Sequence, residues 1–151
     1  MNEAAAKIIS TWQYPGDYAV YNLPSFEIMK VQNYSLLDKS KSGNYHCFWD
    51  SNNELIAYIN ITPKGEDTVF LSIALAPNHC GKGMGAEILK MGVDIIRSRY
   101  PGYRIKLNVR AWNLRAIKCY TSIGFNIDKT EVIADYKGVP TAFVFMSMQP
   151  G

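Results

Sequence analysis

The sequence lacks long apolar segments, a basic leader and any cysteine pattern typical of disulfide-rich or metal-binding proteins. No apolar run approaches the roughly 20 residues needed to span a bilayer, and residues 1–7 are neither basic nor apolar enough to form a signal peptide. The three cysteines form no even set and no CxxC spacing, and there are only two histidines. We therefore predict a reduced, cytoplasmic protein that binds no metal ion.

The length and composition fit a single compact domain. The chain has 151 residues, of which 48% are hydrophobic and 19% are charged, as in an average globular domain. No internal repeat, low-complexity tract or linker interrupts it. We predict one domain over residues 1–151.

The net charge of +3 conceals an uneven distribution along the chain. Residues 1–79 carry five lysines against eight acids, residues 80–120 carry nine lysines and arginines against two acids, and residues 121–151 carry two lysines against three acids. A basic middle between acidic flanks suits a polyphosphate ligand and a cationic second substrate. A solvated helix face with scattered charges explains the same distribution equally well.

Apolar periodicity and turn residues predict a mixed α/β fold. We expect a mostly antiparallel central sheet flanked by helices, with Gly124 as the left-handed C-cap of the last helix. The predicted helices span residues 3–12, 24–37, 113–123 and the stretch from a glycine loop at 81–85 to about residue 100. The predicted strands span residues 44–50, 55–62, 68–76, 104–110, 125–135 and 141–148.

Three alternating glycines, Gly81, Gly83 and Gly85, join the third predicted strand to the third predicted helix. Glycine lets the backbone approach an anion closely because no Cβ intervenes. The unpaired N–H groups and the dipole at the start of the following helix then favour a phosphate group. The loop therefore predicts a pyrophosphate site, although a turn that only permits close packing is the alternative.

Coenzyme A is the ligand class that fits this loop best. The pattern Gly81-x-Gly83-x-x-Ala86 matches the dinucleotide fingerprint, but that fingerprint needs an acidic residue after the next strand. That strand offers Lys106, Asn108 and Arg110 instead. A nucleoside-triphosphate loop would need Gly-Lys-Ser/Thr, which is absent here.

Two segments about thirty residues apart carry a family resemblance. They read Leu75-Ala76-Pro77…Gly81-x-Gly83-Met84-Gly85…Leu89 and Asn113-Leu114-Arg115-Ala116-Ile117-Lys118-Cys119-Tyr120-Thr121-Ser122-Ile123-Gly124-Phe125. Together they resemble the acetyl-CoA motifs of the GNAT superfamily of N-acetyltransferases over residues 67–125, and the final hairpin extends the likeness to about residue 148. The resemblance implies a GNAT-like fold, acetyl-CoA as co-substrate and acetyl transfer to a primary amine.

The resemblance also implies roles for single residues. The strand Ile73-Ala74-Leu75 would pair through its backbone with the pantetheine arm, and Asn113 would contact the same arm. Tyr120 would protonate the departing thiolate, with a core aromatic as the alternative. The pyrophosphate would be held by backbone N–H groups of Gly81, Lys82, Gly83, Met84, Gly85 and Ala86.

Three features depart from the family pattern. Cys80 stands where a Gln or Arg usually contacts phosphate, and it is either a small buried side chain or an oxidisable thiol. Asn108 stands where enzymes that acetylate ribosomal-protein N-termini tend to carry a catalytic Glu, and Asn cannot accept a proton. The chain begins almost at the first helix, at Glu3, so the family's first strand is missing or replaced.

The residues that would bind the acceptor and take its proton have more than one interpretation. Asp67 falls where histone-type members carry a Glu, and it could act as a base through water or be a solvated turn residue. The acceptor is a small-molecule amine or a protein or peptide amine. Four aromatic residues could form a slot for it or belong to the core and its edge, namely Trp12, Tyr14, Tyr18 and Tyr21.

Two further alternatives concern activity and assembly. A catalytically silent, CoA-binding regulatory module would use the same fold, whereas nucleic acid is not expected as a partner because no recognition motif is present. An unpaired edge at residues 44–50, or the hairpin at residues 125–148, predicts a homodimer. A segment at residues 14–23 that folds over the edge would instead leave a monomer.

Overall fold

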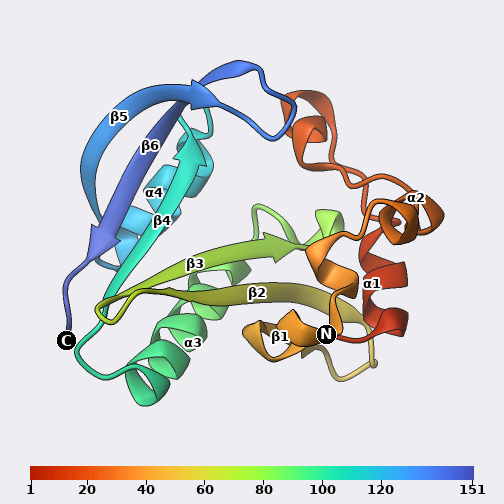
Figure 1. Cartoon of the computed structure of the whole chain (residues 1–151), viewed down its shortest axis with the longest axis horizontal. Coiled ribbons are helices and arrows are strands. Elements are labelled where there is room, and N and C mark those ends of the chain that lie inside the picture. Colours follow the sequence, from red (N-terminus) through yellow and green to blue (C-terminus); the bar gives the residue numbers. More distant parts are fainter. The chain divides into compact units, whose positions relative to one another are not determined.

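Six strands form one sheet in the order β1-β2-β3-β4-β6-β5 (Figure 1). The computed structural model describes residues 1–151. Its helices are α1 (Glu3–Ile9), α2 (Phe26–Val31), α3 (Met84–Arg99) and α4 (Leu114–Ile123), with 3-10 helices η1 (Gly16–Tyr21), η2 (Ser35–Leu37), η3 (Lys39–Asn44) and η4 (Pro77–His79). Its strands are β1 (Tyr45–Trp49), β2 (Leu55–Lys64), β3 (Thr68–Leu75), β4 (Arg104–Arg110), β5 (Asn126–Ala134) and β6 (Pro140–Met148).

The predicted mixed α/β class is confirmed, and every strand lies within two residues of its predicted bounds. β1 pairs antiparallel with β2, and β6 pairs antiparallel with both β4 and β5, whereas β3 and β4 run parallel. Within residues 1–151 no strand precedes α1, as the sequence led us to expect, and β1 is an edge of the sheet.

A second helix predicted at residues 24–37 is confirmed as α2, but its predicted end was wrong, because the helix stops at Val31. Asn33 has a left-handed φ of 54°. The N–H of Tyr34 donates to the carbonyl of Met29 and the N–H of Asn33 to that of Lys30, at 3.1 and 3.3 Å. This is the Schellman arrangement with Asn in place of glycine, and it ends the helix. The first helix is also shorter than predicted, ending at Ile9 and not at Trp12.

The chain divides into two compact units, and each is assembled from two stretches of sequence. The N-terminal unit comprises residues 1–60 and 73–82, and the C-terminal unit comprises residues 61–72 and 83–151. Because β2 and β3 contribute residues to both units, the single domain over residues 1–151 stays a prediction.

The N-terminal unit has a core built around α1. The side chain of Asn2 caps this helix by accepting from the N–H of Ala5 at 2.8 Å. The ring of Trp12 stacks on Tyr58 with the centroids 6.1 Å apart. Burial of aromatic and aliphatic side chains of this size stabilises the unit by about 1.5–3 kcal/mol per residue. The buried cluster comprises Ala5, Ala6, Ile9, Trp12, Phe26, Met29, Leu36, Leu55 and Ala76.

The C-terminal unit contains the longest regular elements of the chain. α3 buries one stripe of side chains that includes Leu89, Val93 and Ile96, as expected for an amphipathic helix. α4 packs against α3 and ends at Gly124, whose φ of 119° confirms the predicted left-handed C-cap. β5 and β6 form a long curved hairpin beside β4 (Figure 1).

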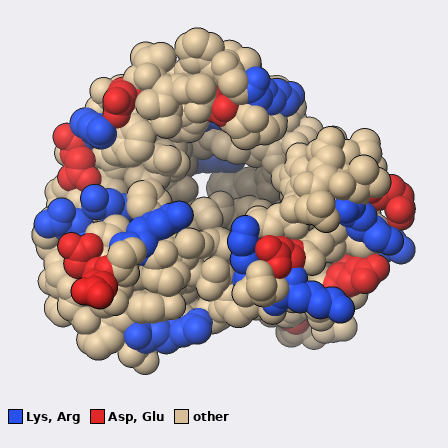
Figure 2. Space-filling model, in the orientation of Figure 1, with Lys and Arg blue, Asp and Glu red and all other residues tan.

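The surface mixes charges of both signs. On the face shown in Figure 2, lysine and arginine side chains lie among aspartates and glutamates. None of the helices is both long and apolar enough to cross a membrane.

Candidate active site

The N-terminal unit holds the strand end that leads into the glycine loop. Ile73, Ala74 and Leu75 are half-buried at the end of β3. The carbonyl of Leu75 accepts a hydrogen bond of 2.6 Å from the hydroxyl of Tyr14. The thiol of Cys80 lies 3.6 Å from the carbonyl of Ala76, so it is directed toward backbone oxygens.

The glycine loop has the backbone geometry that anion binding requires. Gly81 and Gly83 adopt left-handed φ values of 75° and 78°. A Cβ built on either one would have no atom within 4 Å, so the space in front of both is open. Gly83 is the N-cap of α3 and supplies no side chain to cap the helix. The first N–H groups of α3 are therefore suited to a phosphate group, and the chain fits the pyrophosphate of CoA here.

Asn113 is the N-cap of α4, and its side chain caps the start of this helix. It is buried, and its Oδ1 accepts from the N–H of Ala116 at 3.2 Å. An N-cap of this kind stabilises a helix by about 1 kcal/mol. The contact between Asn113 and the CoA arm stays a prediction.

Tyr120 lies on α4 one helical turn before the C-cap. It is half-buried, and its ring packs edge-on against Phe125 with the centroids 6.3 Å apart. The N–H of Phe125 donates to the carbonyl of Tyr120 at 3.1 Å. These contacts hold the backbone and one ring face in place, which suits a residue that must present its hydroxyl in one position.

Asp67, the candidate base, lies in the turn before β3, and Asn108, which stands where related enzymes carry a catalytic Glu, lies on β4. Asp67 is exposed, accepts from the hydroxyl of Thr68 at 2.9 Å and accepts through its carbonyl from the N–H of Arg104 at 2.8 Å. Arg104 is the first of the seven residues of β4, and Asn113 follows the end of that strand. Asp67, which is bound to Arg104, is therefore at the opposite end of β4 from Asn113, and the strand is roughly 20 Å long. Asn108 is exposed on β4, and its amide cannot take a proton.

The four aromatic residues predicted for the acceptor divide into two pairs. Trp12 belongs to the core, and Tyr14 is half-buried with a pKa raised well above its usual range by burial. Tyr18 is half-buried and Tyr21 is exposed, and both lie on η1. Trp12 alone is buried, so the core interpretation holds for it, and the slot interpretation stays a prediction for the three tyrosines.

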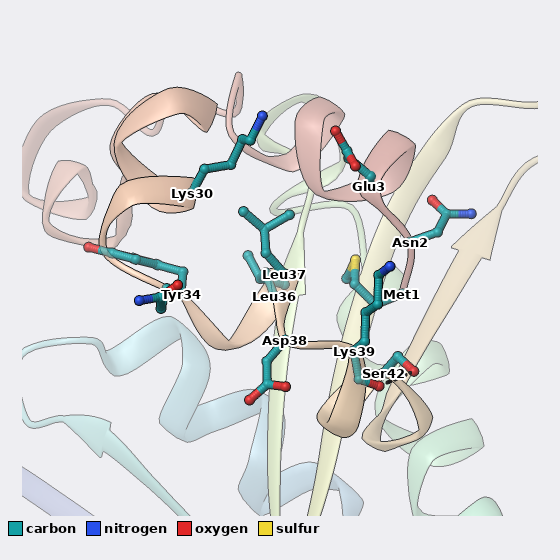
Figure 3. Close-up of a pocket in the computed structure, with 11 residues that line it drawn as sticks. Met1, Asn2, Glu3, Lys30, Tyr34, Leu36, Leu37, Asp38, Lys39 and Ser42 are labelled. Atoms are coloured by element: carbon teal, nitrogen blue, oxygen red, sulfur yellow. Dashed lines mark hydrogen bonds between the residues drawn. The ribbon is translucent and has the colours of Figure 1, made fainter.

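A cavity of about 730 Å³ in the N-terminal unit was missed by the sequence reasoning (Figure 3). Glu3 and Asp38 supply acidic groups, and Lys30 and Lys39 supply basic ones, so the lining selects neither sign of charge. Hydrogen bonds from the hydroxyl and N–H of Ser40 hold the pKa of the Asp38 carboxyl below its usual value. The lining residues are Met1, Asn2, Glu3, Lys30, Asn33, Tyr34, Leu36, Leu37, Asp38, Lys39 and Ser42.

A family model described as the acetyltransferase (GNAT) family matches residues 7–125. The chain belongs to the GNAT acetyltransferase family. Acetyl-CoA is the co-substrate of this family, in agreement with the open glycine loop at the start of α3. No curated protein matches the chain by sequence.

Solved structures of GNAT proteins share the fold. An acetyltransferase of the GNAT family from Bacillus anthracis has a TM-score of 0.79 at 13% identity, over 97% of this chain and 90% of that one. A phosphinothricin acetyltransferase from Sinorhizobium meliloti in complex with AcCoA has a TM-score of 0.65 at 21% identity, over 86% and 72%. Spermidine N-acetyltransferase from Vibrio cholerae, in complex with CoA and spermine, has a TM-score of 0.67 at 18% identity, over 85% and 77%.

Proposed function

We propose that this protein is an acetyl-CoA-dependent N-acetyltransferase that transfers the acetyl group directly to a primary amine. The observation that carries the proposal is the open, left-handed backbone at Gly81 and Gly83 before a helix start that no side chain caps. Family membership and the acetyl-CoA complex of a structural neighbour support the same ligand. The end of β3, at Ile73 to Leu75, would hold the pantetheine arm through its backbone.

The proposed reaction needs one proton donor in the C-terminal unit. The neutral amine attacks the thioester carbonyl, the new C–N bond forms and the C–S bond breaks. The CoA thiolate takes its proton from the hydroxyl of Tyr120, and the amine gives its extra proton to water. Tyr120 then recovers a proton from solvent. Asp67 is not needed in this scheme, because it is exposed and bound to the start of β4.

For the acceptor we propose a cationic amine that approaches η1. Tyr18 and Tyr21 offer aromatic surface there, and Asp17 adds a negative charge in the first turn of the same 3-10 helix. Structural neighbours include enzymes whose names specify spermidine and phosphinothricin as substrates. A small amine and a peptide amine both fit this chemistry, so a screen of amines must include the two kinds.

A silent CoA-binding module is the second candidate, because Asn108 cannot accept a proton and Asp67 is an exposed turn residue. Calorimetry with acetyl-CoA, followed by thioester loss with a panel of polyamines, amino acids and peptides, separates the two functions. Binding with turnover supports the enzyme, and binding without turnover on any amine supports the module. No binding of acetyl-CoA would overturn both.

We also propose that the chain forms a homodimer through the edge strand β5. This strand exposes Ile127 and Val132, at 56% and 65% of their surface, and a second β5 could pair with it across a two-fold axis. Light scattering over a dilution series should give twice the monomer mass, and Val132→Lys should shift it toward the monomer. A mass near 17.0 kDa at every concentration would rule out the dimer.

A further inference from the structure

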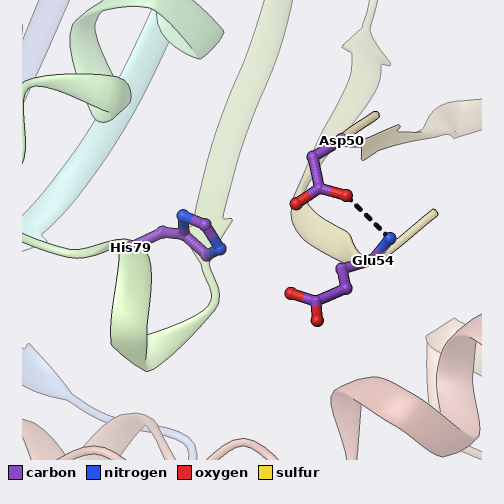
Figure 4. Close-up of side chains that lie close together, drawn as sticks. All are labelled: Asp50, Glu54 and His79. Atoms are coloured by element: carbon purple, nitrogen blue, oxygen red, sulfur yellow. Dashed lines mark hydrogen bonds between the residues drawn. The ribbon is translucent and has the colours of Figure 1, made fainter. Parts of the chain in front are cut away.

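Three metal-binding side chains from two separate segments meet in the N-terminal unit. Asp50 and Glu54 flank the turn between β1 and β2, and His79 ends η4. One ligand atom from each lies within 4.8 Å of those of the other two. Figure 4 shows the imidazole of His79 facing the two carboxyl groups.

The hydrogen bonds of this cluster leave its ligand atoms available. Oδ1 of Asp50 accepts from the N–H groups of Asn52 and Glu54, at 2.9 Å each, which orients the carboxylate within the turn. The side chains of Glu54 and His79 have no hydrogen bond or ion pair with any residue. Hydrogen bonds that orient a carboxylate from behind are typical of metal ligands. The Asp50 carboxylate is therefore held in one orientation, and the side chains of Glu54 and His79 beside it are available to bind a cation.

We propose that Asp50, Glu54 and His79 bind a divalent transition-metal cation, with Zn²⁺ as the best-suited ion. Two carboxylates and one imidazole supply three ligands and two negative charges, and water would complete a four-coordinate site. The imidazole nitrogen favours Zn²⁺, Co²⁺ or Ni²⁺ over Mg²⁺ and Ca²⁺, which prefer oxygen ligands. The ring does not form an ion pair with either carboxylate, so the cluster is not an ordinary histidine–acid pair.

The site has a defined place in the chain. His79 comes two residues before Gly81, so a bound cation would tie the β1–β2 turn to the segment that enters the glycine loop. This restraint acts within the N-terminal unit, to which all three ligands belong. Metal binding at the cluster is independent of acetyl transfer, and its test therefore uses binding and stability.

Titration calorimetry on the full chain without a histidine tag tests the site directly. Wild-type protein should bind one Zn²⁺, bind Mg²⁺ far more weakly and unfold at a higher temperature when Zn²⁺ is present. Asp50→Asn keeps an oxygen for the turn, and Glu54→Gln and His79→Gln preserve side-chain length. Each variant should weaken Zn²⁺ binding by about 100-fold or more, since loss of a group behind a ligand already costs about 10–100-fold.

Matched variants distinguish this site from other zinc-binding groups. Cys80→Ser removes the thiol beside His79, and His46→Gln removes the other histidine. Both should bind Zn²⁺ as the wild type does. Circular dichroism and unfolding temperatures without metal check that every variant folds. The proposal is overturned if wild-type protein binds no Zn²⁺, if Glu54→Gln and His79→Gln both bind it unchanged, or if Cys80→Ser loses it.

Discussion

The two units differ in how their structure is specified. The C-terminal unit consists of long regular elements, the 16-residue α3 and the nine-residue strands β5 and β6. In the N-terminal unit the two α-helices have at most seven residues, and four 3-10 helices make up much of the rest of its helical structure. An isolated helix this short is not stable in water, so its conformation depends on tertiary packing and capping.

Short sequence patterns predict functional residues better in the C-terminal unit than in the N-terminal unit. The helix starts predicted for cofactor and proton transfer, at Gly83 and before Tyr120, lie in the C-terminal unit, where each follows a recognisable local pattern. In the N-terminal unit the informative contacts join distant positions. The hydroxyl of Tyr14 reaches the carbonyl of Leu75, 61 positions away.

The largest effect should come from Gly83→Val, which tests whether the start of α3 carries cofactor binding. The valine side chain would fill the open space in front of the helix start and keep phosphate away from its N–H groups. Two charge-assisted hydrogen bonds of about 1.5–3 kcal/mol each would be lost. Calorimetry should therefore show acetyl-CoA affinity reduced by about 100-fold or more.

Gly102→Val is the matched control for that substitution. Gly102 has a φ of 84° with open space around it, so valine incurs there the same backbone penalty, about 1–2 kcal/mol. It should destabilise the protein as Gly83→Val does and leave acetyl-CoA affinity unchanged. Equal losses of affinity in the two variants would mean that Gly83 acts only through stability.

Tyr120→Phe should reduce turnover by about 100-fold, because it removes the hydroxyl that is the proposed proton donor. The ring contact with Phe125 is preserved, so acetyl-CoA affinity and unfolding temperature should not change. Single-turnover rates with the best amine from the screen, compared with the affinity of each variant, measure the effect. An unchanged chemical step would assign the proton transfer to water or another group and weaken the contrast between the units.

Sequence patterns predicted the sheet and the glycine loop before α3 because each depends on short-range features. The positive φ at Gly83 and Gly124 and the buried stripe of α3 follow from residue type and spacing. The end of α2 does not follow from residue type, because Asn can adopt either a right-handed or a left-handed backbone conformation. The surrounding fold determines that Asn33 is left-handed. The cluster of Asp50 and His79 has no local signature, because β2 and β3 lie between the two in the chain.

We expect an ion pair between Arg110 and Asp135 to make the stability of the C-terminal unit depend on pH. Nη2 of Arg110 lies 3.2 Å from Oδ2 of Asp135, and both side chains are less than 10% exposed. The pKa of Asp135 is held below its usual value, most strongly by a hydrogen bond from the N–H of Val139. A hydrogen bond from the N–H of Lys137 and the nearby Arg110 guanidinium lower this pKa further. A lowered folded-state pKa contributes stability that is present at neutral pH and lost as the pH falls through that value.

Asp135→Asn should therefore lower the unfolding temperature by several degrees at pH 7. The asparagine oxygen still accepts from the turn N–H groups, but Arg110 keeps a buried charge without its partner. The difference from wild type should begin to shrink below about pH 4, where the unfolded chain takes up a proton at this carboxyl, and should vanish as the pH falls through the lowered pKa of the folded state. Asp128→Asn, an exposed position on β5 that accepts from Ser147, is the control and should change little. A difference that stays constant from pH 7 to pH 3 would contradict this account.

The smallest effect should come from Tyr14→Phe, and it tests what the N-terminal unit contributes to the cofactor. The hydroxyl of Tyr14 donates to Leu75, in the strand segment proposed to hold the pantetheine arm. Its loss leaves the Leu75 carbonyl without this donor, at a cost of about 1–3 kcal/mol. If Tyr14 positions that strand, KM for acetyl-CoA should rise a few-fold while kcat and KM for the amine stay constant. If Tyr14 lines the acceptor slot instead, KM for the amine should rise and KM for acetyl-CoA should not.

Tyr136→Phe, in the exposed turn between β5 and β6, is the control and should change neither KM. A rise of either KM in this variant would mean that general destabilisation causes the effect.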